Sequence, residues 1–223
     1  MKKFLGIALV LALTLTWGVG NAMADSITYT IDNPGSALSG FAGPYATVTV
    51  NLIHSTNAAI TFNASTMAGV TFLMGASQVA DVNVNATTWS VSGLSGTSLS
   101  GFSNGTLSDG GSANVGSFGV FNQTFDNFDG YTHSHDSIVF TLTNIGSTWA
   151  SASNVFVANA QGYYVAIHGF ACTAPCDPAA GALTTGTATT GGAVNTPEPA
   201  SVLLLGGGLI GMGVLNRRKE TLA

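Results

Sequence analysis

Lysine, arginine and glutamate are absent from the long central part of this chain, residues 25–195. All cations of the 223-residue sequence lie close to its two ends: Lys2, Lys3, Arg217, Arg218 and Lys219. Nucleic-acid binding depends on Lys and Arg that neutralise phosphates, so their absence excludes this function for the central part. Capture of a phosphate or carboxylate ligand by an arginine fork is excluded for the same reason.

The acidic residues of the central part are all aspartates. There are eight of them: Asp25, Asp32, Asp81, Asp109, Asp126, Asp129, Asp136 and Asp177. A glycosidase with paired glutamates is therefore excluded, and only a hydrolase with paired aspartates stays open. The pattern Gly-x-Ser-x-Gly occurs around Ser103, but its Ser/Gly-rich surroundings predict neither the strand nor the helix that a nucleophile elbow requires. Because no catalytic set is complete, we predict that the protein is not an enzyme.

The first 24 residues have the pattern of a signal peptide. Lys2 and Lys3 precede an apolar run from residue 4 to residue 16, and Ala22 and Ala24 form a small-x-small cleavage site. We therefore expect the mature chain to begin at Asp25 and to be exported.

Residues 196–219 have a second pattern, that of a membrane anchor with an unusual start. Its first part is a proline-flanked acid: Pro197, Glu198 and Pro199. Proline restricts its own backbone and that of the preceding residue, so these residues are expected to be extended. Residues 200–216 carry no charge, and as a helix they would be about 25 Å long, slightly less than a hydrocarbon core of about 30 Å.

Three cations follow this apolar segment: Arg217, Arg218 and Lys219. Cations beside an apolar segment are held on the cytoplasmic side of a membrane. We therefore expect a single transmembrane helix at residues 200–216, with residues 220–223 as the end of a cytoplasmic tail. An ordinary tail anchor is the alternative, but it needs no Pro-Glu-Pro sequence.

The order of Pro-Glu-Pro, a short Gly-rich apolar segment and a cationic end resembles a PEP-CTERM sorting signal. The resemblance covers residues 196–219. It implies processing by an exosortase, a membrane-embedded, transpeptidase-like enzyme of Gram-negative bacteria that make extracellular polysaccharide. It also implies a transient anchor in the inner membrane, and then a place at the cell surface or in the extracellular matrix.

The apolar residues of the body recur at every second position. In residues 45–52, Val48, Val50 and Leu52 alternate with threonines and an asparagine, as in a half-buried strand. Similar short runs separated by Gly, Asn, Ser and Pro predict strands at residues 26–31, 45–52, 59–62, 70–74, 81–85, 87–91, 117–122, 137–143, 154–158 and 163–168. We therefore predict an all-β fold, an antiparallel β-sandwich over residues 25–176 with a jelly-roll or Ig-like topology as alternatives.

Two low-complexity segments interrupt or follow this pattern. Residues 92–116 are rich in Ser and Gly and are interpreted as a long loop or a loosely paired edge region. Residues 177–195 are rich in Ala, Thr and Gly and are interpreted as a flexible stalk that holds the domain off the membrane.

Potential ligands for a metal gather at residues 126–136. Three carboxylates, Asp126, Asp129 and Asp136, could supply the oxygen atoms that Ca²⁺ prefers, although the spacing is not that of an EF-hand. His133 and His135 would share one face of a strand, so a transition metal is a second possibility. A solvated turn that leads into the strand at 137–143 is the third.

Cys172 and Cys176 are the only cysteines of the chain. In an exported protein a local disulfide is the expected outcome. A metal site with His168 is the alternative, because the three residues are spaced by four.

The sequence thus predicts an exported, exosortase-sorted protein of the cell surface or extracellular matrix, associated with exopolysaccharide or biofilm. The alternative function is a calcium-dependent carbohydrate-binding module, in which Tyr131, Trp149 and Tyr163 would stack on sugar rings. An aspartate-dependent hydrolase, with two of the eight aspartates close together in a cleft, is the third hypothesis.

Overall fold

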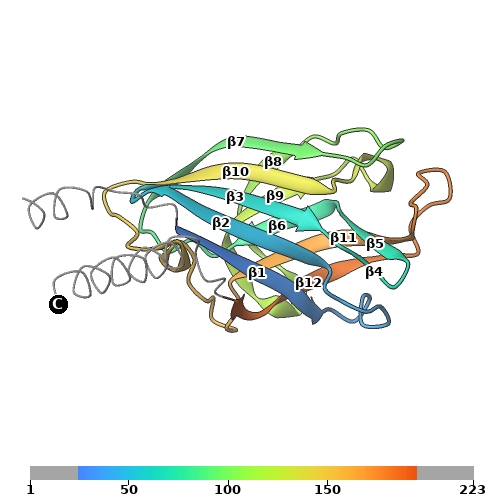
Figure 1. The fold of residues 1–223 in the computed structure, drawn as a ribbon, viewed down its shortest axis with the longest axis horizontal. Helices are drawn as coiled ribbons and strands as arrows, with labels where there is room; N and C mark the ends of the chain where they lie inside the picture. The colour runs from blue at the N-terminus through green and yellow to red at the C-terminus, as the bar shows by residue number, and fades with distance from the viewer. Residues whose placement is uncertain (1–24, 195–223) are drawn as a thin grey trace, which may run out of the picture.

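The computed structural model describes residues 25–194 and consists of β-strands joined by loops and short 3-10 turns (Figure 1). The strands are β1 (Asp25–Pro34), β2 (Ala46–His54), β3 (Asn57–Ala64), β4 (Thr66–Met67), β5 (Val70–Met74), β6 (Ala76–Val82), β7 (Trp89–Thr97), β8 (Ser108–Asn114), β9 (Val120–Asn127), β10 (Ser137–Asn144), β11 (Val165–Thr173) and β12 (Thr184–Val194). The turns are η1 (Gly116–Phe118), η2 (Tyr131–His133) and η3 (Ala152–Asn154). Within residues 25–194 there is no helix long and apolar enough to cross a membrane.

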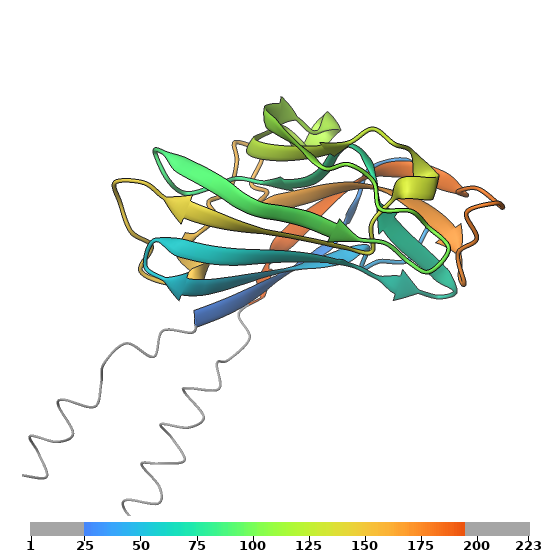
Figure 2. The same ribbon diagram turned by 90° about the horizontal axis from the view of Figure 1, so that it is seen from above.

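Hydrogen bonds join all twelve strands into one sheet, and each pairing is antiparallel. The order is β7-β10-β3-β2-β1-β12-β11-β6-β9-β8, while β5 pairs with β11 beside β6 and carries β4 at its other side. The sheet curls into a half-barrel around a common interior (Figure 2). The predicted all-β fold is confirmed. A sandwich of two separate sheets is not confirmed, because β1, β12 and β11 continue the hydrogen bonding from one side of the curl to the other.

The concave side of the sheet holds the main hydrophobic core. Strand β2 shows the predicted alternation: Val48, Val50 and Leu52 are fully buried, and the residues between them are partly or fully exposed. Facing strands add residues such as Ile60 and Phe140 to the same cluster. Each such side chain contributes about 1.5–3 kcal/mol relative to an exposed one, so this apolar stripe largely determines which face of each strand points inward.

Strand β12 corrects the sequence interpretation of residues 177–195 as a stalk. From residue 184 onward the segment is a strand between β1 and β11, at the centre of the sheet. Its small residues make this possible: a Cβ on Gly186 would lie 2.9 Å from the Cβ of Ala37, and Ala188 and Thr189 are fully buried. The folded body therefore extends to Val194 and does not stop at residue 176.

The Ser/Gly-rich segment 92–116 forms the two edges of the sheet, in agreement with the loosely paired edge that was one of its two interpretations. Strand β7 pairs only with β10 and β8 pairs only with β9, and both pairings have register irregularities. The strand expected at 154–158 is absent, since Phe156 makes only an isolated bridge with Val84. The predicted signal peptide, sorting residues and transmembrane helix lie outside the described residues.

Candidate functional site

The three carboxylates predicted to bind calcium are directed to three different segments of the chain. The Oδ1 atom of Asp126 accepts a hydrogen bond from the backbone N–H of Gln78, at 2.8 Å. Asp129 accepts one from the backbone N–H of Thr106 at 2.6 Å, and this bond lowers the pKa of its carboxyl group. Asp136 accepts one from the hydroxyl of Thr97 at 2.8 Å. Proximity in sequence has not brought the three together.

The two histidines of this segment are also separated. His133 lies in η2, where its Nδ1 atom is 3.0 Å from the hydroxyl of Thr132. His135 is fully buried against Gly96, on which a Cβ would lie 2.4 Å from Nδ1 of the imidazole. Burial lowers the pKa of His135, so its neutral form is favoured.

The structure therefore does not assemble a single centre from the predicted ligands Asp126, Asp129, Asp136, His133 and His135. Among residues 25–194, no three His, Cys, Asp or Glu side chains lie close enough together to hold a metal ion.

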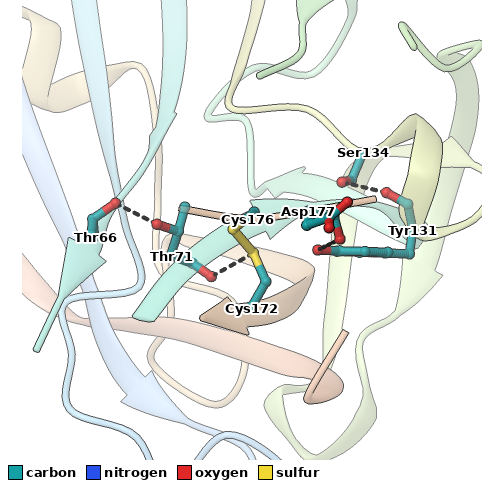
Figure 3. The surroundings of a disulfide bond; sticks show 7 residues. All are labelled: Thr66, Thr71, Tyr131, Ser134, Cys172, Cys176 and Asp177. Carbon is teal, nitrogen blue, oxygen red and sulfur yellow. Dashed lines mark hydrogen bonds between the residues drawn. A yellow bond between two sulfur atoms is a disulfide. The ribbon is translucent and has the colours of Figure 1, made fainter. Parts of the chain in front are cut away.

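The predicted disulfide between Cys172 and Cys176 is confirmed, and their Cα atoms are 5.4 Å apart (Figure 3). Cys172 is buried at the end of β11, with its Sγ atom 3.4 Å from the carbonyl oxygen of Thr71 in β5. The alternative metal site with His168 is excluded, because the two sulfur atoms are bonded to each other. The ring of His168 instead lies between the Ser77 carbonyl and the Thr185 hydroxyl, at 3.0 and 3.2 Å.

A surface pocket of about 250 Å³ lies beside the disulfide, lined by residues 172–175, 177 and 180–183. Its rim is held by Tyr131, whose hydroxyl donates to the carbonyl oxygen of Asp177 at 3.4 Å (Figure 3). The Tyr131 ring packs edge-on against Phe102 and Phe170, with centroid distances of 5.1 and 5.5 Å. This is one place where an aromatic residue and a hollow lie side by side.

The other two aromatics expected to stack on sugars have structural roles. Trp149 is 2% exposed, and its indole N–H donates to the carbonyl oxygen of Asn85. Tyr163 packs against Phe118 in a small second core on the convex side of the sheet. Because Trp149 is buried, its predicted role in sugar stacking is wrong. The alternation of polar and apolar residues in the sequence did not reveal that this aromatic side chain is buried.

Asp81 is an unusual site residue that sequence reasoning did not single out. It lies in β6 between Ala80 and Val82, which face the main core, so its side chain points to the opposite face. It is fully buried, and neither carboxylate oxygen has a hydrogen-bond partner. Burial, and then the nearby charge of Asp126, raise its pKa well above the ordinary value. An aspartate inside a run of buried residues was the signal that could have revealed it.

The comparisons with known proteins add one finding. The family profile of the PEP-CTERM protein-sorting motif matches residues 195–219. Neither the curated proteins nor the solved structures gave a significant match. The matched residues begin directly after the last residue of β12. The chain therefore carries a PEP-CTERM protein-sorting motif at residues 195–219, and this motif implies export and processing by an exosortase.

Proposed function

We propose that this protein is a non-enzymatic component of the cell surface or extracellular matrix, associated with exopolysaccharide or biofilm. The observation that carries the proposal is the direct succession of a folded β-domain and a sorting motif, with β12 ending at Val194 and the motif beginning at residue 195. Such a chain delivers one folded domain to its destination. After release of the signals, the delivered part is the domain itself.

The roles of the aspartates support a non-enzymatic domain. Several accept hydrogen bonds from backbone N–H groups and so hold the chain in place: Asp25 binds Ala152, Asp109 binds Gly111 and Asp177 binds Ala179. Asp126 and Asp129 do the same for the segments described above. The paired-aspartate hydrolase would need two carboxylates in an open cleft.

The sorting part of the proposal is tested by fractionation of cells with and without the exosortase. We expect the full chain to accumulate in the inner membrane when the enzyme is absent, and at the surface or in the medium when it is present. A variant with Pro197, Glu198 and Pro199 replaced by alanine should behave like the enzyme-deficient strain. An unchanged distribution in both cases would contradict the proposal.

The pocket beside Tyr131 favours a second candidate function, binding of a carbohydrate. Sugar rings stack on aromatic faces, and here Tyr131, whose ring packs against Phe102, is hydrogen-bonded to Asp177 in the wall of a hollow of about 250 Å³. Phe128, 73% exposed and three residues before Tyr131 in the sequence, is another accessible ring. We expect Tyr131→Ala to weaken binding to the producer's own exopolysaccharide in a co-sedimentation assay. Tyr163→Ala, which changes a partly buried tyrosine packed against Phe118 in the small second core, is the matched control. Equal binding by both variants would argue against this pocket.

A further inference from the structure

Two buried side chains face each other across β6 and β9 without hydrogen-bond partners. Asp81 pairs in register with Thr124, and both residues are fully buried. Opposite residues of an antiparallel pair point to the same face, so the carboxylate and the hydroxyl are neighbours. Neither oxygen of Asp81 nor Oγ1 of Thr124 has a hydrogen-bond partner. Three neighbouring buried oxygen atoms thus lack a hydrogen-bond partner.

Asp126 completes this group from the same strand as Thr124. It lies two residues further along β9 and therefore on the same face. Its Oδ1 atom is held by the N–H of Gln78, in the irregular part of β6. Its Oδ2 atom faces Gly110 of β8. A Cβ on Gly110 would lie 2.6 Å from that Oδ2 atom and 2.6 Å from Oγ1 of Thr124. Glycine thus leaves a small space that is bordered by two oxygens.

The arrangement needs a counter-charge that the chain does not provide. A buried carboxylate without a partner is costly, far more so than a buried neutral polar group. Residues 25–195 contain no Lys or Arg that could form an ion pair with it. A proton on Asp81 would remove the charge, but it would not fill the space that Gly110 leaves beside Thr124 and Asp126. A hard cation would satisfy both carboxylates and the hydroxyl together.

We propose that Asp81, Thr124 and Asp126 form a binding site for a divalent cation of the Ca²⁺ type, located between β6 and β9 beneath Gly110. Calcium accepts carboxylate, hydroxyl and water oxygens at about 2.3–2.6 Å and tolerates irregular geometry. With two carboxylates, the affinity should be that of extracellular calcium modules, a Kd of about 10⁻⁴–10⁻³ M. Asp129 and Asp136 take no part. The site is independent of the proposed surface function.

The test uses thermal unfolding of the full chain in a mild detergent, after treatment with a chelator. We compare 10 mM CaCl2 with NaCl of the same ionic strength. At about tenfold excess over Kd, calcium should raise the melting temperature by about 3–6 °C. A rise in melting temperature in CaCl2 no larger than the rise in NaCl would overturn the proposed site.

Three variants locate the ion, and each keeps the backbone intact. Asp81→Asn removes the buried charge, and Asp126→Asn keeps the acceptor for Gln78. Gly110→Ala puts a methyl group into the space between the two oxygens. All three should lose the calcium-dependent rise, while circular dichroism in chelator shows that they fold.

Asp129→Asn is the matched control, because it changes an exposed aspartate three residues after Asp126 and keeps an acceptor for Thr106. It should retain the full rise. Loss of the rise in Asp129→Asn together with its retention in Asp81→Asn would place the ion in the 126–136 loop, and would overturn the proposed site. If Asp81→Asn does not fold, the calcium response of Gly110→Ala decides whether the site exists. Gly110 is only partly buried in β8, so this substitution does not change the buried carboxylate.

Discussion

Strand β12 and strands β7 and β8 are built from nearly the same small polar residues, yet they occupy opposite positions in the sheet. Strand β12 has the sequence TTGTATTGGAV and lies at the centre, whereas WSVSGLSGT in β7 and SDGGSAN in β8 form the two ends. Ala188, Thr189 and Thr190 of β12 are buried, but no residue of β8 is. Composition therefore does not determine position. Strand β12 differs from β7 and β8 in that it pairs with two neighbours and is closely packed around Gly186.

Hydrogen bonds explain how threonines can lie at the centre. The hydroxyl of Thr189 donates to the carbonyl oxygen of Val165 at 2.6 Å, and that of Thr190 accepts a hydrogen bond from the backbone N–H of Tyr164 at 3.4 Å. A buried hydroxyl with a partner costs little free energy, while one without a partner is destabilising. At the edges, the polar side chains face water and need no such partner.

The largest expected effect comes from a charge introduced at the two positions. Ala188→Asp in β12 would bury a carboxylate in a region without Lys or Arg, so the free energy of unfolding should fall by more than about 4 kcal/mol. Ala113→Asp in β8 is the same change at a half-buried edge residue, and it should cost less than about 1 kcal/mol. Urea unfolding of both variants measures the difference. Similar losses would mean that centre and edge are packed alike.

A smaller effect is expected from one added methyl group. Gly186→Ala in β12 would place a Cβ 2.9 Å from Ala37 and 3.2 Å from the Cγ atom of Leu38, so overpacking should cost about 1–3 kcal/mol. Gly40→Ala is the matched control, since nothing lies within 4 Å of its Cβ position. It should be neutral within about 0.5 kcal/mol. Thermal unfolding at constant pH compares them, and a neutral Gly186→Ala would show that the centre is loosely packed.

The smallest effect concerns a buried histidine beneath the edge strand β7. His135 lies under Gly96 of β7, and burial lowers its pKa while the charges of Asp136 and Asp129 partly offset that shift. Since the unfolded chain binds a proton at higher pH than the native chain, this histidine removes stability as pH falls below about 6.5. His135→Leu should therefore flatten the loss of stability between pH 7.5 and 5.5. An unchanged pH dependence would mean that the imidazole titrates normally.

The sequence predicted the parts of the fold that rest on local apolar alternation. Val48, Val50 and Leu52 alternate with polar residues, and the strand through them was predicted almost at its observed bounds. Strand β12 was missed because threonine, alanine and glycine show no contrast of hydropathy. Its burial depends on β1 and β11, which lie about 150 and 20 residues away in sequence.

The candidate site divides in the same way. The disulfide joins cysteines four residues apart, so spacing alone could predict it. Asp81 and Asp126 are brought together only by the register of β6 and β9, which no local pattern reveals. The sequence instead grouped Asp126 with Asp129 and Asp136, its neighbours along the chain. Those neighbours instead accept hydrogen bonds from Thr106 and from Thr97 at the end of β7.

The central position of β12 has a consequence for the order of events during export. A chain that leaves the cytoplasm from its N-terminus delivers β1 first and β12 last of all the strands. Until β12 arrives, β1 and β11 lack their shared neighbour, and no strand of one half of the sheet pairs with a strand of the other half. The residues that follow β12 are the sorting motif. Assembly of the domain and arrival of the motif at the membrane therefore coincide, so that the exosortase meets a substrate whose body has only just become able to close.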